Sequence, residues 1–200
     1  MSRVDVRSIR RRQILDAAER LAAQKGWTET TIADICQVAN VSTGVVTRHF
    51  ESKDEIMLAA LEDVLEQFQA QLKPFLGSES PLAENIYQVF SQVVTSQATL
   101  PQLLLHSFAT SISRPEIAER LHTFFSNLRQ QHTADLELQL DQKGIVGTDR
   151  VILINLLYNL AFGLISSRVT LGSDLSLEQL AFHCSNMLLK YFDLPQEAKE

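Results

Sequence analysis

The chain has 200 residues, of which 45% are hydrophobic, and its formal net charge is −6. This length suits one domain of ordinary size or two small ones, with enough apolar residues to form cores. No apolar run approaches the ~20 residues of a membrane span, and the arginine-rich N-terminus lacks the apolar stretch of a secretory signal. We therefore expect a cytoplasmic protein without a membrane partner.

The sequence offers little support for a metal site or a catalytic site. Cys36 and Cys184 are far apart and lack metal-like spacing, which indicates reduced thiols. His122 and His132 lie ten residues apart, ~15 Å along one helix, so they cannot share an ion. No phosphate-binding glycine loop or nucleophile motif is present. We expect no enzyme activity, no metal and no cofactor.

Charge is distributed unevenly along the chain. Residues 1–53 contain nine Lys/Arg and six Asp/Glu, whereas residues 54–200 contain nine and eighteen. The two parts therefore carry +3 and −9, which together give −6. A small basic module can direct a polyanion to one end of a protein that is acidic as a whole. We predict one domain at 1–53 and a second at 54–200.

Hydrophobic periodicity predicts helices nearly everywhere and no run of alternating residues long enough for a strand. The expected fold is all-α: an N-terminal three-helix domain and a larger helical C-terminal domain. Proline and glycine residues separate the segments. The expected helices span about 8–25, 31–39, 42–50, 53–72, 82–98, 102–112, 115–142, 149–170 and 176–192.

The first expected helix has an apolar stripe and a glycine at its end. Gly26 is suited to the left-handed position after a helix, and Trp27 can pack back beneath that helix. The stripe consists of Ile14, Ala17, Ala18 and Leu21.

Residues 31–42 predict a short helix followed by a tight turn. Thr31 and Asp34 resemble a capping box. Apart from glycine, asparagine is the residue type that best accepts left-handed geometry, so Asn40 is suited to the turn. Ser42 would cap the next helix, and Ser52 with Glu55 would cap the long helix after that. The expected inner face of the short helix is Ile32, Ile35 and Val38.

The helix expected at 42–50 has little charge, and it has the shape that the DNA major groove requires. Val46 and Phe50 face inward, so that Thr43, Val45 and Arg48 face outward. Gly44 removes a side chain where the backbone would approach DNA, at a helix penalty of ~1 kcal/mol. Few short side chains are needed to read base edges, because phosphates are held from the flanks.

This segment resembles the N-terminal signature of the tetracycline-repressor (TetR) family of bacterial regulators. Asn40 stands where that family usually has glycine, and Thr47 stands where it usually has a tyrosine that contacts phosphate. The resemblance implies a helix-turn-helix motif at about 31–50, a double-stranded DNA operator as partner, and a homodimer. The matching positions are Thr31, Ile35, Ala39-Asn40-Val41, Ser42, Gly44, Thr47, His49, Phe50, Ser52 and Lys53.

The resemblance also implies roles for individual residues. Thr31, His49 and Lys53 would contact phosphates, while Thr43, Gly44 and Val45 would approach base edges. Thr31 and Ser42 can also be helix caps alone. Arg48 can contact either a phosphate or a base edge. Arg11 belongs to an arginine arm that is either solvated or contacts the DNA backbone. The complete candidate set is Arg11, Thr31, Ser42, Thr43, Gly44, Val45, Thr47, Arg48, His49 and Lys53.

The resemblance places a small-molecule pocket among the helices from about 54 to 165. Ring side chains and few cations there favour a small amphipathic or aromatic effector. His132 continues an apolar stripe, so it is either a ligand contact or a core histidine with a satisfied hydrogen bond. The candidates are Tyr87, Phe90, His106, Phe108, Phe124, Phe125, His132, Tyr158 and Phe162.

Helix 149–170 is apolar almost all round and helix 176–192 has an apolar stripe, so both need covering surfaces. A homodimer joined by a four-helix bundle would cover them. Asn155 and Asn159 could bind a ligand, hydrogen-bond across the dimer or fix its register. The candidate interface residues are Leu156, Leu160, Leu164, Leu180, Cys184 and Leu188.

These features predict a dimeric DNA-binding repressor that a small molecule releases from its operator. A DNA-bound architectural or protein-recruiting factor of the same fold, without a sensor, is one alternative. An enzyme that uses the C-terminal cavity is another, although the sequence lacks an acid–base or nucleophile set for it.

Overall fold

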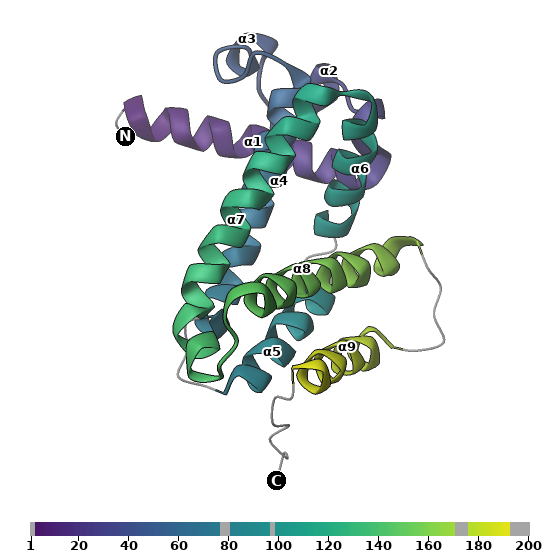
Figure 1. Ribbon diagram of the computed structural model, residues 1–200. Coiled ribbons are helices and arrows are strands. Elements are labelled where there is room, and N and C mark those ends of the chain that lie inside the picture. Colours follow the sequence, from purple (N-terminus) through teal and green to yellow (C-terminus); the bar gives the residue numbers. More distant parts are fainter. Residues whose placement is uncertain (1–2, 77–80, 97–98, 171–175, 193–200) are drawn as a thin grey trace. The chain divides into compact units, whose positions relative to one another are not determined.

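The computed structural model describes residues 3–76, 81–96, 99–170 and 176–192, and within these residues it is helical without strands (Figure 1). The all-α prediction is confirmed for this part of the chain. The helices are α1 (Arg3–Glu29), α2 (Ile32–Ala39), α3 (Thr43–Val46), α4 (Lys53–Leu76), α5 (Leu82–Thr95), α6 (Thr99–Ser113), α7 (Pro115–Gln142), α8 (Gly147–Thr170) and α9 (Leu177–Tyr191).

Three helices differ most from the expected bounds. Helix α1 begins earlier, at Arg3, and continues past the break at Gly26 to Glu29. Helix α4 continues through Pro74 to Leu76 instead of stopping before the proline. Helix α3 ends at Val46, and the chain continues to Phe50 in hydrogen-bonded turns. The predicted helix at 42–50 is therefore only four residues of α-helix.

The chain forms two compact units, one from residues 1–67 and 97–122 and the other from 68–96 and 123–200. Helices α4 and α7 each contribute residues to both units. The division predicted between residues 53 and 54 concerns function, and it remains a prediction.

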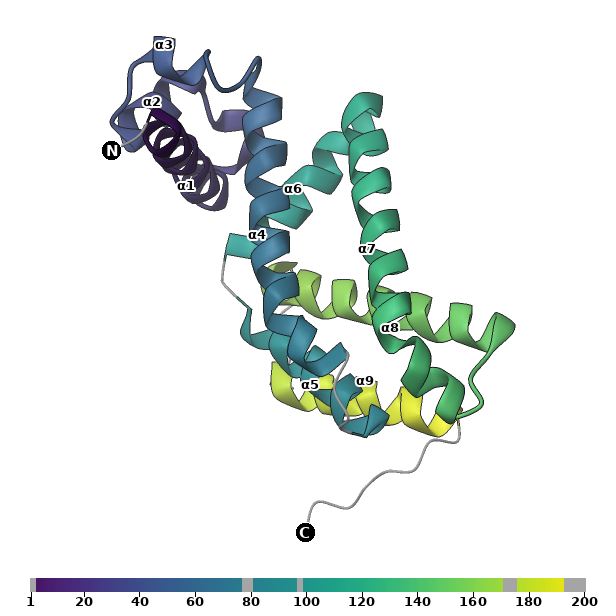
Figure 2. The same cartoon turned by 90° about the vertical axis from the view of Figure 1, so that its left-hand side faces the viewer.

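In the first unit, α1 packs against α2 and α6, and α2 packs against α3. Figures 1 and 2 both show α1, α2 and α3 grouped together. The predicted stripe of α1 and the predicted packing of Trp27 are confirmed, because these side chains are buried. The unit's buried apolar residues include Ile14, Ala17, Ala18, Leu21, Trp27, Ile35, Val46 and Phe50.

Gly26 ends the first straight part of α1, as predicted. Its φ of 87° and ψ of 166° interrupt the helical backbone. A Cβ atom at this position would lie 2.8 Å from Cε1 of His106, a residue of α6. Two independent conditions therefore require glycine, the positive φ and the close approach of an imidazole ring.

In the second unit, α5, α8 and α9 pack against one another (Figure 2). Phe90 and Leu153 are fully buried in this unit. The guanidinium of Arg168 donates to the carbonyl oxygen of Ser96 at 3.1 Å and to its Oγ at 2.8 Å, so α8 is tied to the end of α5.

Candidate nucleic-acid interface

Helix α2 begins with the capping box that the sequence predicted. The Asp34 amide donates to Thr31 Oγ1 at 3.2 Å, and the Thr31 amide donates to Asp34 Oδ2 at 2.8 Å. Lys25 Nζ donates to the same carboxylate oxygen at 2.6 Å. Hydrogen bonds from Lys25 and Thr31 lower the pKa of Asp34 to about 2. Thr31 is therefore a helix cap whose backbone is held by an ionised carboxylate.

The turn after α2 has the predicted left-handed residue. Asn40 has φ 53° and ψ 49°, and the Val41 amide donates to the Cys36 carbonyl oxygen at 3.0 Å. The expected inner face of α2 is only partly correct: Ile35 is buried, whereas Val38 is 41% exposed. Ala39, four residues after Ile35, packs inward instead, because positions i and i+4 share one face of a helix.

Ser42 precedes α3 in the N-cap position, but its side chain makes no capping hydrogen bond. The predicted capping role is therefore wrong for the side chain, although the extended backbone at Ser42 is that of a cap. Val46 and Phe50 are buried as predicted, and they anchor α3 and the following turns. The Arg48 and Phe50 amides donate to the carbonyl oxygens of Val45 and Val46, respectively.

The outward side of α3 and its following turn is short and polar. Thr43, Gly44, Thr47 and Arg48 are exposed, and Val45 is half-buried. A Cβ atom at Gly44 would meet no protein atom closer than 4.0 Å, so packing within the protein does not require glycine here. The absence of a side chain matters only for something that approaches from outside.

The start of α1 brings positive charge to this turn. The guanidinium carbon of Arg11 lies 5.5 Å from the centre of the Phe50 ring, and the half-buried His49 ring lies beside the same phenylalanine. Partial burial lowers the pKa of His49, and the charges of Arg7 and Arg11 lower it further. A phosphate at this position would meet several cations.

Arg12, the residue after Arg11, forms ion pairs within the protein. Its guanidinium pairs with Asp63 on α4 at 2.7 Å and with Asp16 one turn along α1 at 2.8 Å. The arginines of α1 therefore divide between a structural ion pair and the candidate DNA surface.

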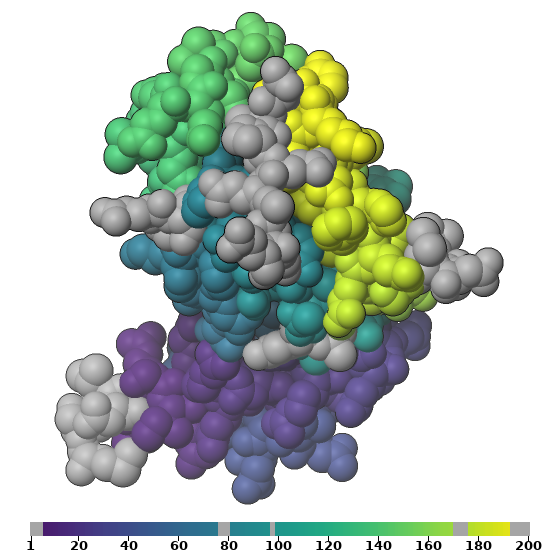
Figure 3. All heavy atoms as spheres, turned by 90° about the horizontal axis from the view of Figure 1, so that it is seen from below, coloured from purple at the N-terminus to yellow at the C-terminus, as the bar shows by residue number. Residues whose placement is uncertain are grey.

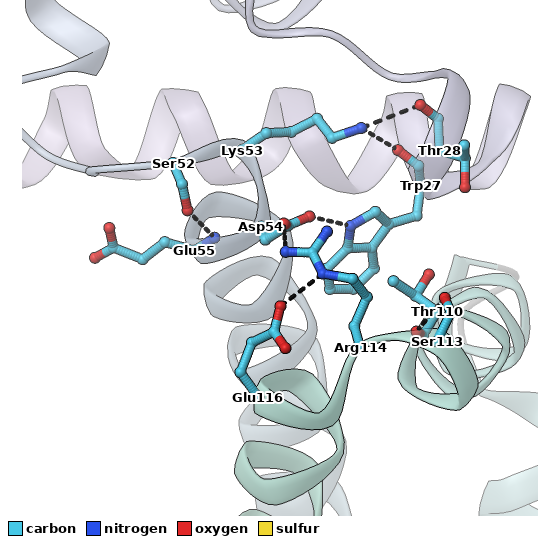
Figure 4. Close-up of polar contacts among 10 residues, drawn as sticks. All are labelled: Trp27, Thr28, Ser52, Lys53, Asp54, Glu55, Thr110, Ser113, Arg114 and Glu116. Atoms are coloured by element: carbon cyan, nitrogen blue, oxygen red, sulfur yellow. Dashed lines mark hydrogen bonds and ion pairs between the residues drawn. The ribbon is translucent and has the colours of Figure 1, made fainter.

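Lys53 is half-buried, and its ammonium group is already engaged within the protein. Nζ donates to the Trp27 carbonyl oxygen at 3.1 Å and to the Thr28 carbonyl oxygen at 3.0 Å (Figure 4). These carbonyls follow the backbone break at Gly26. An ammonium group has three N–H donors. Two of them are used in these hydrogen bonds, so the predicted phosphate contact of Lys53 would use the third.

The predicted capping box at the start of α4 forms by half. The Glu55 amide donates to Ser52 Oγ at 3.1 Å, but the Glu55 carboxylate accepts from the Glu51 amide at 2.6 Å. Asp54, the residue before Glu55, accepts hydrogen bonds from Trp27 Nε1 at 2.8 Å and from Arg114 at 2.6 Å (Figure 4). Sequence reasoning missed this cluster because its members lie far apart in the chain.

The candidate pocket residues fall into separate groups. In the second unit, Phe125 makes edge-to-face contacts with Phe124 at 5.5 Å and with Phe162 at 5.2 Å between ring centres. Tyr87 packs against Phe182 of α9, and Phe90 is fully buried in α5. His106 and Phe108 lie on α6 in the first unit.

His132 is hydrogen-bonded within the protein, which agrees with the prediction of a core histidine whose hydrogen bond is satisfied. Its Nδ1 lies 2.8 Å from the hydroxyl oxygen of Tyr158, and the two rings stack. The guanidinium carbon of Arg129 lies 5.9 Å from the Tyr158 ring centre. Burial lowers the pKa of His132 and raises the pKa of Tyr158.

The candidate dimer residues are less exposed than the sequence suggested. Leu164 and Leu188 face the interior, with Leu188 only 1% exposed. Leu156, Leu160, Leu180 and Cys184 are half-buried. Leu164 and Leu188 can support an interface from within, but they offer it no surface.

Other side chains of α8 and α9 are exposed instead, and Figure 3 shows α9 at the surface of the second unit. The Asn155 amide group donates to the Val151 carbonyl oxygen of its own helix. The exposed large apolar side chains of the two helices are Val151, Val169, Phe182, Met187 and Tyr191. Asn155, Asn159 and Gly163 are also exposed on α8.

Comparison with known proteins identifies the segment that carries this geometry. Residues 14–60 match the bacterial regulatory proteins of the tetR family. The similarity to the tetR family is therefore shown for this N-terminal segment. A relative from Burkholderia ambifaria (strain MC40-6), "HTH-type transcriptional regulator BetI", is 40% identical over 70 residues, so the match spans 35% of this chain and about a third (36%) of that protein.

Solved structures share the fold of this chain over most of its length. FadR of Bacillus subtilis, solved with stearoyl-CoA, has a TM-score of 0.75 at 16% identity, covering 88% of this chain and 96% of that protein. GusR of Salmonella enterica has a TM-score of 0.69 at 22% identity, covering 92% and 95%. At these identities the similarity concerns the fold alone.

Two further properties of the described residues bear on earlier expectations. They contain no group of three or more His, Cys, Asp or Glu residues that could hold a metal ion. The segment Gly147–Val169 of α8 is long and apolar enough to cross a membrane by length and composition, which the sequence analysis did not anticipate. Only 28% of the most apolar stretch of this segment is buried, so much of α8 can pack against another protein surface.

Proposed function

We propose that this protein is a transcriptional repressor that binds a DNA operator as a homodimer and leaves it when a small amphipathic or aromatic molecule binds. The observation that carries the DNA-binding part is the geometry around α3. Asn40 turns the chain sharply, and the buried Val46 and Phe50 fix which side of α3 faces out. The side that remains exposed has only short polar groups and one arginine.

On this proposal, Thr43, Gly44 and Val45 approach base edges in the major groove. Phosphate contacts come from the flanks: Arg11 and His49 on one side, with Thr31 and Lys53 at helix starts. Ser42, Thr47 and Arg48 are exposed on the same surface. Thr47 reaches less far than the tyrosine usual in the family, so its phosphate contact would be short.

The exposed apolar side chains of α8 and α9 support the dimer. Phe182, Met187 and Tyr191 on α9 and Val151 on α8 are exposed, and water solvates such apolar side chains poorly. A second copy of the chain would cover these side chains through a four-helix bundle. Two linked DNA-binding segments would then contact two half-sites of an operator.

Release by a small molecule has weaker support. FadR of Bacillus subtilis, which has a similar fold, was solved with stearoyl-CoA. In the present protein, the rings of Phe124, Phe125 and Phe162 lie together, and His132 with Tyr158 supplies polar groups in the same unit. An amphipathic or aromatic molecule would match that mixture. We expect cytoplasmic localisation and no catalytic activity.

A salt titration with an operator selected from random duplexes tests the DNA surface. Thr43→Ala or Val45→Ala should alter preference at one or two base pairs, at a cost of ~1–3 kcal/mol, and leave the salt slope nearly unchanged. Lys53→Ala should weaken all sequences about equally and reduce the slope by about one per half-site. The placement of α3 in the groove is wrong if neither Thr43 nor Val45 affects preference.

The contacts of Lys53 add a control to this titration. Lys53→Ala also removes two hydrogen bonds to the end of α1, so its thermal unfolding must be measured alongside. A loss of stability with an unchanged salt slope would make Lys53 structural only. The non-sensing alternative is tested separately, by screening for a compound that raises the melting temperature and releases the operator.

A further inference from the structure

Arg114 lies outside the segment that matches the tetR family, between the last residue of α6 and the first residue of α7. Its guanidinium holds two carboxylates. One terminal nitrogen donates to Asp54 Oδ2 at 2.6 Å, and Nε donates to Glu116 Oε1 at 2.6 Å (Figure 4). Because the guanidinium is planar, the hydrogen bond from Nε to Glu116 restricts the orientation in which the terminal nitrogen meets Asp54.

Asp54 in turn holds the end of α1. Its second oxygen, Oδ1, accepts from the indole Nε1 of Trp27 at 2.8 Å. Trp27 is buried, and it lies four residues before Thr31, the cap of α2. The position of the indole therefore bears on where the helix-turn-helix begins.

Lys53 connects the same two segments through the backbone, with hydrogen bonds to the carbonyl oxygens of Trp27 and Thr28. The first two residues of α4 thus grip the end of α1 at three atoms. Arg114 is the cation that satisfies the remaining oxygen of the half-buried Asp54 carboxylate. Without that cation, the carboxylate would gain hydration by rotating toward water and away from the indole.

We infer that Arg114 is a positioning residue of the DNA-binding surface: through Asp54 and Trp27 it holds the end of α1 against the start of α4. The inference rests on the proposed DNA-binding function. It assigns no DNA contact to Arg114, so the number of phosphates neutralised by the protein does not depend on this arginine.

The chain offers a matched control. Arg120 lies on α7, six residues after Arg114; it too pairs with a carboxylate of α4, Glu62 at 3.2 Å, and it has the same side-chain exposure of 45% as Arg114. Glu62 has no hydrogen bond to Trp27 among the contacts described. Arg114→Ala and Arg120→Ala therefore remove equal charge from similar exposed ion pairs, and only the first reaches the indole.

The experiment compares both variants with the wild type in operator binding at several salt concentrations. Arg114→Ala should weaken binding by up to about fivefold, as expected for an exposed ion pair, with the salt slope unchanged. Arg120→Ala should stay within about twofold of the wild type. In an Asp54→Asn background, Arg114→Ala should have no further effect, because its partner carboxylate is already gone.

Trp27 provides a second measurement, since the chain contains one tryptophan and its emission reports a single indole. Arg114→Ala should shift that emission, whereas Arg120→Ala should not. Far-ultraviolet circular dichroism establishes that each variant is folded before it is compared.

Equal affinities of the two variants for operator, or unchanged Trp27 emission in Arg114→Ala, would overturn the inference. A salt slope lowered by about one per half-site would overturn it too, by making Arg114 a phosphate contact. Failure of the wild type to select any operator would instead remove the proposed function itself.

Discussion

Residues 31–50 expose hydroxyl groups, a glycine and an arginine, whereas α8 and α9 expose Val151, Phe182, Met187 and Tyr191. In the first region a sharp turn and two buried anchors determine which side faces water. In the second, the protomer has more apolar surface than it can bury. The first surface suits a hydrated polyanion and the second suits a protein partner, so the proposed DNA contact and the proposed dimer use separate parts of the chain.

The largest expected effect comes from a substitution that disrupts the proposed dimer contact of α9. Phe182 is 50% exposed on α9, so Phe182→Glu should leave the protomer folded but place a carboxylate in the covered interface. An unpaired buried charge costs several kcal/mol, and we expect the dissociation constant of the dimer to rise by more than about 100-fold. Analytical ultracentrifugation over a concentration series measures this.

Ile112→Glu is the control for that change, because Ile112 is 89% exposed on α6 and lies in the other unit. It makes the same kind of substitution at a solvated position and should leave the dimer intact. Equal dissociation constants for Phe182→Glu and the wild type would show that a second copy does not cover α9.

The comparison also explains how much the sequence could predict. Most helix ends followed from local chemistry, such as the Thr31 cap, the Asn40 turn and Gly26. The outward side of α3 followed from two anchors, Val46 and Phe50, because a short helix after a fixed turn has a defined orientation.

Contacts between distant parts of the chain could not be predicted in this way. Lys53 binds carbonyls 25 and 26 residues earlier, and Arg114 binds a carboxylate 60 residues earlier. The exposed side of α8 was equally inaccessible, because an almost uniformly apolar helix does not indicate which side its own protomer buries. This is why Leu164 and Leu188 were assigned to an interface whose surface belongs to other residues.

A smaller effect tests the claim that backbone turns shape the N-terminal region. Gly26→Ala combines a positive φ with an overlap at His106, so it should lower the free energy of unfolding by about 2–4 kcal/mol. The double variant with His106→Ala should recover the part due to overlap and keep the part due to φ. Urea denaturation measures all three proteins. If the double variant were no more stable than Gly26→Ala, the contact with His106 would not contribute.

The smallest effect concerns the hydrogen-bonded pair of His132 and Tyr158 in the second unit. Burial lowers the pKa of His132, so the folded state keeps this imidazole neutral, while the unfolded chain protonates it near the ordinary value of 6.5. As pH falls below about 6.5, the unfolded state binds more protons, and stability present at higher pH is lost, at most at ~1.4 kcal/mol per pH unit. His132→Gln should keep a hydrogen bond to Tyr158 and remove this part of the pH dependence. His49 also has a lowered pKa, but it is present in both proteins and cancels in their difference. The measurement is the urea midpoint of each protein at several pH values between 5 and 8. Parallel curves for the two proteins would mean that His132 is protonated alike in the folded and unfolded states, and that its pairing with Tyr158 does not hold the imidazole neutral.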